Sequence, residues 1–389
     1  MAGEAARSPT RIAPDRELVA SLLASGGEDL RLCMQCATCS AVCELADERN
    51  PGPRKEMLWA QWGLRDRLMG DPDTWLCHGC GDCTVRCPRG ARPGDVMAAL
   101  RREQVLHYSV SRGFGRWVNQ AGALPWLALG AAVALAVAAV VWAAAGAGQV
   151  ELALGGSRTV FPYWTRLPHW LLHAVFGLLV IFDVFILARG ARRFWRDLHA
   201  DAGRGGQARG PGASWRAAFR RILWHEDFAR CAESRARRTS HLLVVYGMVS
   251  LALTSFWAVT ARWNPLLEGL VYPFGFWNPW KILANLGGLA VVVGVTLMLA
   301  ERWQRPKTAG ATRYADGLLL GFLLVIALTG FASEVLHFLR VEPLRFGVYA
   351  AHLVSVLALL WILPYTKLAH AVYRTLAVVY AERTGRGGR

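Results

Sequence analysis

The chain is 389 residues long, 54% of them hydrophobic, and carries a formal net charge of +16 at pH 7. This length allows two domains, and the long apolar runs all lie after about residue 118. A basic protein could bind nucleic acid, but here the arginines gather in gaps between apolar runs. That placement fits an anionic membrane surface better than a nucleic-acid groove. Composition therefore argues against a wholly soluble protein and against a nucleic-acid partner.

Residues 1–118 have nearly balanced charge and are expected to form a soluble, helical domain with short loops. The first thirty residues lack an apolar core followed by a small-residue cleavage site, so no signal peptide is expected. Pro53 and the residues through Trp59 are typical of a helix start, with proline near the first turn.

Eight of the nine cysteines form two runs with one spacing, C-x2-C-x2-C-x3-C. The runs are Cys33, Cys36, Cys39, Cys43 and Cys77, Cys80, Cys83, Cys87, the second followed by Pro88. This spacing places three thiolates on one cubane face and lends the fourth to a neighbouring [4Fe–4S] cluster. If the fold crosses over in the usual way, one cluster takes Cys33, Cys36, Cys39 and Cys87. The other then takes Cys77, Cys80, Cys83 and Cys43.

Two other uses of these cysteines are weaker. Zinc sites use paired CxxC units and rarely a third cysteine at this interval. Structural disulfides are disfavoured in the cytosol, and an extracellular disulfide framework would rarely duplicate one spacing so faithfully. The ninth cysteine, Cys231, lies alone in a basic gap and is expected to be an inert thiol.

Six segments after residue 118 are long and apolar enough to cross a hydrocarbon layer about 30 Å thick. They are approximately 123–145, 167–188, 240–261, 279–300, 315–338 and 346–369. Backbone groups in lipid must be paired within the segment, so we expect six transmembrane helices in a domain covering residues 119–389. The whole protein is therefore predicted to be all-α.

The gaps between these segments differ in charge. The gap 189–239 is predicted to be a long basic loop, with a flexible Gly/Arg linker from Gly203 to Gly212. The gap 301–313 and the C-terminal tail are basic as well, whereas 146–166, 262–278 and 339–345 are not. The positive-inside rule then places both termini and the cysteine domain in the cytoplasm of a prokaryote, with the chain in the inner membrane.

A single histidine at the end of a predicted span is often only an interfacial residue, but the pattern of these histidines favours axial haem ligands. His352 and His370 are eighteen residues apart, or five helical turns, so they share one face of the last predicted span. Their axial separation of roughly 27 Å would hold two stacked b-type haems. At matching depths, His241 is predicted to pair with His370, and His173 with His352. His169, one turn from His173, and His337 are the substitutes for His173.

The chain resembles known membrane oxidoreductase subunits in both of its halves. The cysteine runs resemble the C subunit of heterodisulfide reductase. The stretches from Arg238 to His241 and from Pro364 to His370 resemble the haem b subunit of that enzyme and, more distantly, the gamma subunit of respiratory nitrate reductase. The fusion of both halves is similar to the C subunit of the quinone-interacting membrane-bound oxidoreductase complex, Qmo.

The Qmo resemblance implies a six-helix di-haem cytochrome b domain fused to a two-cluster ferredoxin-like domain. It also implies flavin- and iron–sulfur-containing A and B subunits, with adenylylsulfate reductase as the cytoplasmic partner in dissimilatory sulfur metabolism. The gamma-like family carries two haem histidines ten residues apart on one helix, whereas here Leu251 stands ten residues after His241. The outer ligand must therefore come from elsewhere.

Three ionisable residues within the predicted spans are candidates for quinone chemistry, which moves protons with electrons. Lys281 begins the fourth span on its outer side, with Asn285 one turn later, and Glu334 lies one turn before His337. The gamma subunit uses a lysine in a similar place. Snorkelling to the interface is the alternative for Lys281. Asp183, in the middle of the second span, is the third candidate, and it would otherwise pair with a polar neighbour.

The sequence thus predicts a membrane electron-transfer subunit that links the quinone pool through two b haems and two [4Fe–4S] clusters to cytoplasmic subunits. A heterodisulfide-reductase-like module that serves another catalytic subunit is the second interpretation. A transporter or receptor with a metal-bearing cytoplasmic domain is a third, and it is disfavoured because no inverted repeat or broken helix stands out.

Overall fold

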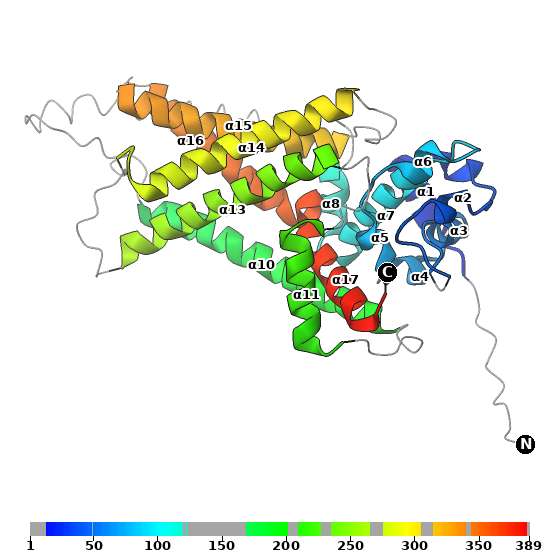
Figure 1. The fold of residues 1–389 in the computed structure, drawn as a ribbon. Coiled ribbons are helices and arrows are strands. Elements are labelled where there is room, and N and C mark those ends of the chain that lie inside the picture. The colour runs from blue at the N-terminus through cyan, green and yellow to red at the C-terminus, as the bar shows by residue number, and fades with distance from the viewer. Residues whose placement is uncertain are drawn as a thin grey trace, which may run out of the picture.

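The structure is a computed structural model that describes residues 13–48, 50–119, 122, 169–200, 209–226, 235–264, 275–304, 314–339 and 344–386. Helices make up the secondary structure of these residues, and no strand occurs among them. Figure 1 shows a compact group of short helices beside a bundle of long ones. The predicted all-α architecture is therefore confirmed for the described residues.

The cysteine-bearing part is built from short helices joined by tight loops. Its helices are α1 (Arg16–Ala24), α2 (Thr38–Ala41), α3 (Arg54–Gln61), α4 (Arg65–Met69), α5 (Asp73–Leu76), α6 (Asp82–Val85), α7 (Pro93–Tyr108) and α8 (Arg112–Asn119), with the 3-10 helix η1 (Glu28–Leu32) after α1. Asp15 caps α1 by accepting a 2.8 Å hydrogen bond from the Leu18 amide. Pro53 directly precedes α3, as the sequence predicted.

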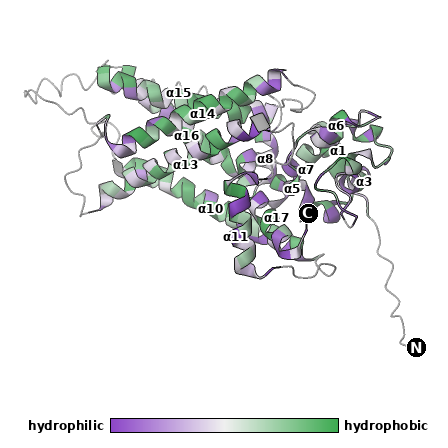
Figure 2. Cartoon of the chain, in the orientation of Figure 1, coloured by the Kyte–Doolittle hydropathy of each residue, from purple (hydrophilic) through white to green (hydrophobic). Residues whose placement is uncertain are grey.

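Five long helices are apolar enough to cross a membrane, which indicates a membrane protein. They are α10 (His169–Ala200), α13 (Arg235–Trp263), α14 (Pro279–Gln304), α15 (Tyr314–Leu339) and α16 (Leu344–Ile362). Figure 2 shows apolar residues along much of their length. They correspond to five of the six predicted spans. The first predicted span, 123–145, lies outside the described residues.

The prediction of one continuous helix over 346–369 is wrong. The helix α16 ends at Ile362, and two 3-10 turns, η6 (Leu363–Tyr365) and η7 (Lys367–Ala369), precede α17 (His370–Thr384). Pro364 lacks an amide hydrogen and disfavours a helical residue before it, which accounts for the break. His352 and His370 therefore lie on separate helices, so counting five turns along a single helix does not relate their positions.

The basic segment 189–239, predicted as a loop, is helical over much of its length. The helix α10 continues to Ala200, α11 (Pro211–Leu223) begins inside the predicted Gly/Arg linker, and α13 begins at Arg235. Phe194 and Leu198 are four residues apart on α10 and fully buried, so this end of the helix packs against protein. Cys231 lies outside the described residues.

Two hydrophobic cores hold the described chain together. The first joins α1, α3, α5 and α7 of the cysteine-bearing part to the ends of α10 and α11 and to α17. At its centre, Trp75 stacks on Tyr373 with ring centres 5.4 Å apart, and Tyr108 lies 5.8 Å from the same tyrosine ring. The second core lies among α14, α15 and α16. The cysteine-bearing part and the basic end of α10 thus share one core.

Glycines allow α13 and α14 to pack unusually closely. A Cβ atom on Gly247 would lie 2.6 Å from the Gly287 carbonyl oxygen, and one on Gly294 would lie 2.8 Å from the Ser240 carbonyl oxygen. Helices in lipid associate through such small residues, because lipid tails give no hydrophobic drive for association. This close packing fixes the backbone directly before His241.

Replacing Gly247 with Leu is expected to destabilise the protein, because the larger side chain would push α13 away from α14. Overpacking of this kind typically costs about 1–3 kcal/mol. Thermal unfolding of the purified protein in detergent would measure the effect. Gly177→Leu on α10 is the matched control, since the described residues leave nothing within 4 Å of its added Cβ. Equal unfolding midpoints for the two variants would contradict the interpretation.

Candidate functional site

The two cysteine runs adopt the same backbone conformation around their second cysteine. In the first run, Gln35 and Ala37 have positive φ angles of 59° and 66°. Gly79 and Gly81 hold the corresponding positions of the second run, with φ angles of 64° and 92°. Left-handed residues on both sides of a cysteine turn the chain back on itself. Only the second run carries the glycines that favour this conformation, so the sequence did not reveal that the first run shares it.

The first two cysteines of each run lie on a loop, called here the first and the second cysteine loop. A short helix follows each loop and carries the third cysteine of the run. The helix α2 follows the first loop and α6 the second, and the two helices pack against each other. Cys43 comes just after α2 in the chain, so this packing carries it to the second loop.

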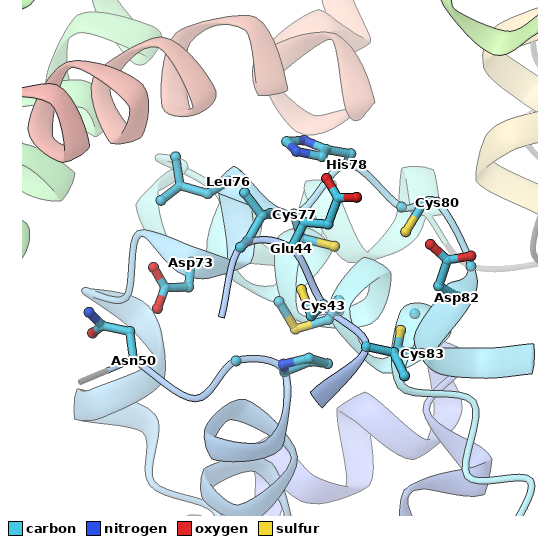
Figure 3. Close-up of a pocket in the computed structure, with 18 of the residues that line it drawn as sticks. Cys43, Glu44, Asn50, Asp73, Leu76, Cys77, His78, Cys80, Asp82 and Cys83 are labelled. Atoms are coloured by element: carbon cyan, nitrogen blue, oxygen red, sulfur yellow. The ribbon is translucent and has the colours of Figure 1, made fainter. Parts of the chain in front are cut away.

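Four cysteines from both runs line one cavity. Cys43, Cys77, Cys80 and Cys83 surround it, and Figure 3 shows them together with Leu76 and His78. Burial raises the pKa of the Cys43 thiol to about 12, and the neighbouring Cys77 and Cys80 contribute to the rise. Such thiols become thiolates when a metal supplies the compensating charge. Four converging thiols fit one iron–sulfur cluster, which would draw its fourth ligand from the first run.

The other four cysteines are Cys33 and Cys36 before α2, Cys39 on α2 and Cys87 after α6. Burial raises the pKa of Cys39 to about 11, and the nearby Cys33 and Cys36 contribute to the rise. Cys36 is exposed. Cys87 accepts a 3.3 Å hydrogen bond from the Ala91 amide, and Cys33 and Cys87 pack against the same hydrophobic core. The predicted ligand sets, with Cys43 and Cys87 exchanged between runs, remain a proposal that this placement supports.

A buried group of charges lies beside this cavity. The Lys55 ammonium lies 2.9 Å from Asp71 and 3.3 Å from Glu56, and it also pairs with Asp73. Burial raises the pKa of Glu56 well above its ordinary value, and the neighbouring Asp71 contributes to the rise. Arg386, beyond α17, lies 3.8 Å from Asp73 and helps tie the C-terminal segment to the cavity wall.

Arginines connect the second cysteine loop to α17 and α13. On α17, Arg374 donates to the carbonyl oxygens of Trp75 at 3.1 Å and Cys77 at 3.3 Å, and its guanidinium lies 3.2 Å from His78 Nδ1. Arg237, near the start of α13, donates to the Gly79 carbonyl and lies 3.4 Å from Glu301. None of these contacts was predicted from the sequence, because Arg237 was interpreted only as a topology signal and Arg374 was not singled out.

The rings of His241 and His370 lie next to each other close to this loop. Their ring centres are 6.2 Å apart and their planes make an angle of 74°. Two imidazoles that hold one metal between them at about 2.0–2.1 Å each have ring centres roughly 6 Å apart. The Nδ1 of His370 donates to the Lys367 carbonyl at 2.5 Å, which leaves Nε2 as the unprotonated nitrogen available to a metal. Burial lowers the pKa of His370 to about 4, so the ring is neutral at pH 7.

The candidate ligands of the outer haem have different surroundings. His352 Nδ1 lies 3.0 Å from the Ile326 carbonyl oxygen, which again leaves Nε2 unprotonated. His173 Nδ1 instead accepts a 2.8 Å hydrogen bond from the Trp263 indole, so the proton of a neutral His173 sits on Nε2. His352 thus has the tautomer of an Nε2 ligand, and His173 has the opposite one.

The two substitutes for His173 lie on different helices. His169 begins α10, and its side chain lies outside the described residues. His337, near the end of α15, lies against Phe338, with ring centres 5.8 Å apart. The outer ligand pair therefore stays a prediction.

The structure brings together the three polar residues that were predicted at the outer side, Lys281, Asn285 and Glu334. The Lys281 ammonium lies 2.9 Å from the Glu334 carboxylate, and Asn285 donates to the same carboxylate at 3.1 Å. Lys281 is therefore ion-paired. Asp183 is buried on α10, and its carboxylate oxygens have no hydrogen-bond partner among the described residues.

The fold and these cysteine loops define an iron–sulfur electron-transfer module joined to a helical membrane part. Residues 29–91 match the family model of the 4Fe-4S dicluster domain, and residues 120–388 match that of citrate utilization protein B. The chain belongs to the citrate utilization protein B family. The chain is 28% identical to Citrate utilization protein B of Escherichia coli over 321 residues, which cover 78% of this chain and 80% of the relative.

The cysteine-bearing part is similar to a second group of proteins, the C subunits of heterodisulfide reductases. A protein of Archaeoglobus profundus described as like this subunit is 41% identical over 86 residues, or 22% of this chain and 46% of the relative. The C subunit of the H(2):CoB-CoM heterodisulfide,ferredoxin reductase of Methanothermobacter marburgensis is 35% identical over 89 residues, or 23% of this chain and 48% of the relative. The chain thus spans about half the length of these two relatives. No solved structure matches.

Proposed function

We propose that the protein is a membrane electron-transfer subunit that links a cytoplasmic oxidoreductase to quinone through two [4Fe–4S] clusters and two b-type haems. One arrangement carries the proposal. The helix α17 begins at His370, whose ring lies next to that of His241, and one turn later Arg374 binds the carbonyl of Cys77. One helix thereby ties a candidate haem ligand to a cluster loop. When bound, these groups supply one-electron carriers, and the chain fixes their positions and tunes their potentials.

The order of the two cluster sites follows from their surroundings. The cavity of Cys43, Cys77, Cys80 and Cys83 lies on the membrane side, because Arg374 of α17 and Arg237 of α13 bind its loop. The first loop faces solvent, with Leu32 and Met34 43% and 67% exposed beside the exposed Cys36. We infer that a cytoplasmic partner exchanges electrons at the first loop and that the second loop passes them to or from the haem of His370.

Two partner sets follow from different observations. The resemblance to Qmo favours flavin- and iron–sulfur-containing A and B subunits and adenylylsulfate reductase. The match of 78% of the chain to Citrate utilization protein B favours an oxidoreductase that takes part in citrate utilisation. Both sets need the same electron-transfer path. Identification of the proteins that co-purify with the full-length chain distinguishes them, and a thiol–disulfide catalytic partner would instead indicate a heterodisulfide-reductase-like module.

The proposed orientation places the cysteine-bearing part in the cytoplasm and the chain in the inner membrane of a prokaryote. The arginine-rich end of α10 and the arginine-rich helix α11 contribute residues to the core that they share with the cysteine-bearing part. The positive-inside rule favours the cytoplasm for these basic segments.

The ion pair between Lys281 and Glu334 is the proposed quinone site. It joins α14 to α15 near their outer ends, and the two side chains are 24% and 12% exposed. Ionisable residues within membrane helices are costly and commonly mark proton pathways. In this proposal Lys281 donates a hydrogen bond to a quinone carbonyl, and Glu334 accepts one of the two protons released when quinol gives up its two electrons.

Replacing Glu334 with Gln, or Lys281 with Met, is expected to slow electron transfer from quinol to haem without loss of haem. Removal of a proton-transfer group typically lowers a rate by about 10²–10⁴-fold. The measurement is the rate at which the b-type absorbance band grows when the purified, oxidised protein is mixed with a quinol analogue.

The chain offers a matched control at the other end of the same two helices. Arg302 on α14 lies 3.2 Å from Asp316 on α15, and Asp316 keeps Lys367 as a partner when Arg302 is replaced. Arg302→Met should therefore leave the quinol reaction at the wild-type rate. Wild-type rates in Glu334→Gln and Lys281→Met would make this ion pair structural, and absence of a b-type band from the wild type would refute the haem proposal.

A further inference from the structure

One buried histidine outside the predicted spans contacts a candidate haem ligand. His225 lies just after α11, is 8% exposed, and places its Nε2 atom 2.7 Å from Nδ1 of His241. Its φ angle of 49° is in the left-handed region, which costs energy for a side chain other than glycine. Strained residues that persist in a fold cluster at functional sites.

The turn that carries His225 is clamped to the helix that carries His241. The Tyr246 hydroxyl on α13 donates to the Leu223 carbonyl at 2.9 Å, and Arg238 on α13 donates to the Trp224 carbonyl at 2.8 Å. These bonds lie within about one and a half turns on either side of His241 in the helix. The relative position of the two imidazoles is therefore fixed by the hydrogen bonds of the turn backbone as well as by the contact between the rings.

The hydrogen bonds around the two rings fit one set of tautomers. His225 Nδ1 lies 3.4 Å from the Leu223 carbonyl oxygen, which can only accept, so a proton on this nitrogen leaves Nε2 of a neutral His225 as an acceptor. The Nε2 atom of His225 then accepts a hydrogen bond from the Nδ1–H group of His241. His241 then presents its unprotonated Nε2, the nitrogen that would bind iron. The carbonyl, His225 and His241 thus form a chain that ends in a ligand nitrogen.

We propose that His225 is a positioning residue that orients His241 as an axial ligand of the haem on the cluster side and sets its tautomer. The inference rests on the proposed function, because it requires a haem between His241 and His370. Metal-ligating histidines almost always donate their second ring nitrogen to an acceptor, which makes the ligand more basic. A more basic ligand stabilises the ferric state, so His225 lowers the midpoint potential of this haem.

The test uses full-length protein purified in detergent with its haem. His225→Gly removes the ring and suits the left-handed backbone. We expect a more positive midpoint potential for one haem, altered g values of its ferric signal, and a roughly 10–100-fold loss of haem affinity. Added imidazole should restore the wild-type potential and g values. His199→Ala is the control, because it removes a ring whose Nδ1 lies 2.8 Å from the Trp195 carbonyl and which packs on Tyr380.

The outcomes separate this inference from the function on which it rests. A haem-replete His225→Gly protein with wild-type potential and g values overturns the role of His225 and leaves the haem proposal intact. Wild-type protein without haem overturns both. Cluster signals in the reduced protein report folding. Should the glycine variant fail to fold, His225→Asn, which tolerates the same backbone, is judged by the same potential and g values.

Discussion

Replacing Cys43 with Ser is expected to remove the cluster beside the second cysteine run and to leave the other cluster in place. Cys43 belongs to the first run by sequence, but it lines the cavity formed by Cys77, Cys80 and Cys83. Serine offers a harder, less acidic oxygen in place of a thiolate, so the cluster loses a ligand that iron requires. Iron and sulfide content should fall by about half, because one of two clusters is lost.

The spectroscopy decides which cluster is missing. Paramagnetic resonance of the reduced wild-type protein should contain two interacting cluster signals, and Cys43→Ser should retain one of them. Cys80→Ser should retain the same signal, whereas Cys39→Ser should retain the other. Cys231→Ser, the change of a cysteine outside both runs, is the control and should keep both. If Cys43→Ser and Cys39→Ser lost the same cluster, the exchange of ligands between runs would be wrong.

The cysteine spacing carried most of the information about the cysteine-bearing part. The spacing identified eight cysteines as two related sets, and the structure places Cys43 with the second set. It did not reveal that both runs have left-handed backbone at the same two positions. The second run has Gly79 and Gly81 there, which favour this conformation, whereas the first run has Gln35 and Ala37, which do not. Backbone conformation is visible in a sequence only where it selects a residue type.

Hydropathy located the long helices better than it located their ends. Hydropathy identifies only the apolar stretch that can cross the hydrocarbon layer. It therefore could not show that α10 continues past its apolar part. The spacing of Phe194 and Leu198 within the arginine-rich stretch was an available signal of a buried face. The break after α16 had a signal as well in Pro364. His225 was missed because only histidines at the predicted spans were considered.

His241→Ala and His370→Ala are each expected to remove one haem, and to remove the same one. The two rings lie 6.2 Å apart between their centres, so they would bind one iron from opposite sides. Loss of either ligand leaves a haem with one protein bond. Pyridine haemochrome analysis should show the b-type absorbance of each variant falling by about half if two haems are bound.

The double variant makes this prediction sharper. Ligands of one haem act as a unit, so His241→Ala combined with His370→Ala should lose no more haem than either single change. Ligands of different haems would instead lose haem additively. His107→Ala on α7 is a matched control, because its Nδ1 lies 2.8 Å from Arg112 and it packs on Tyr108, away from the proposed ligands. Cluster content should be unchanged throughout, because Arg374 and the cysteine loops are intact. Additive loss, or full haem in either single variant, would show that these two histidines do not share an iron.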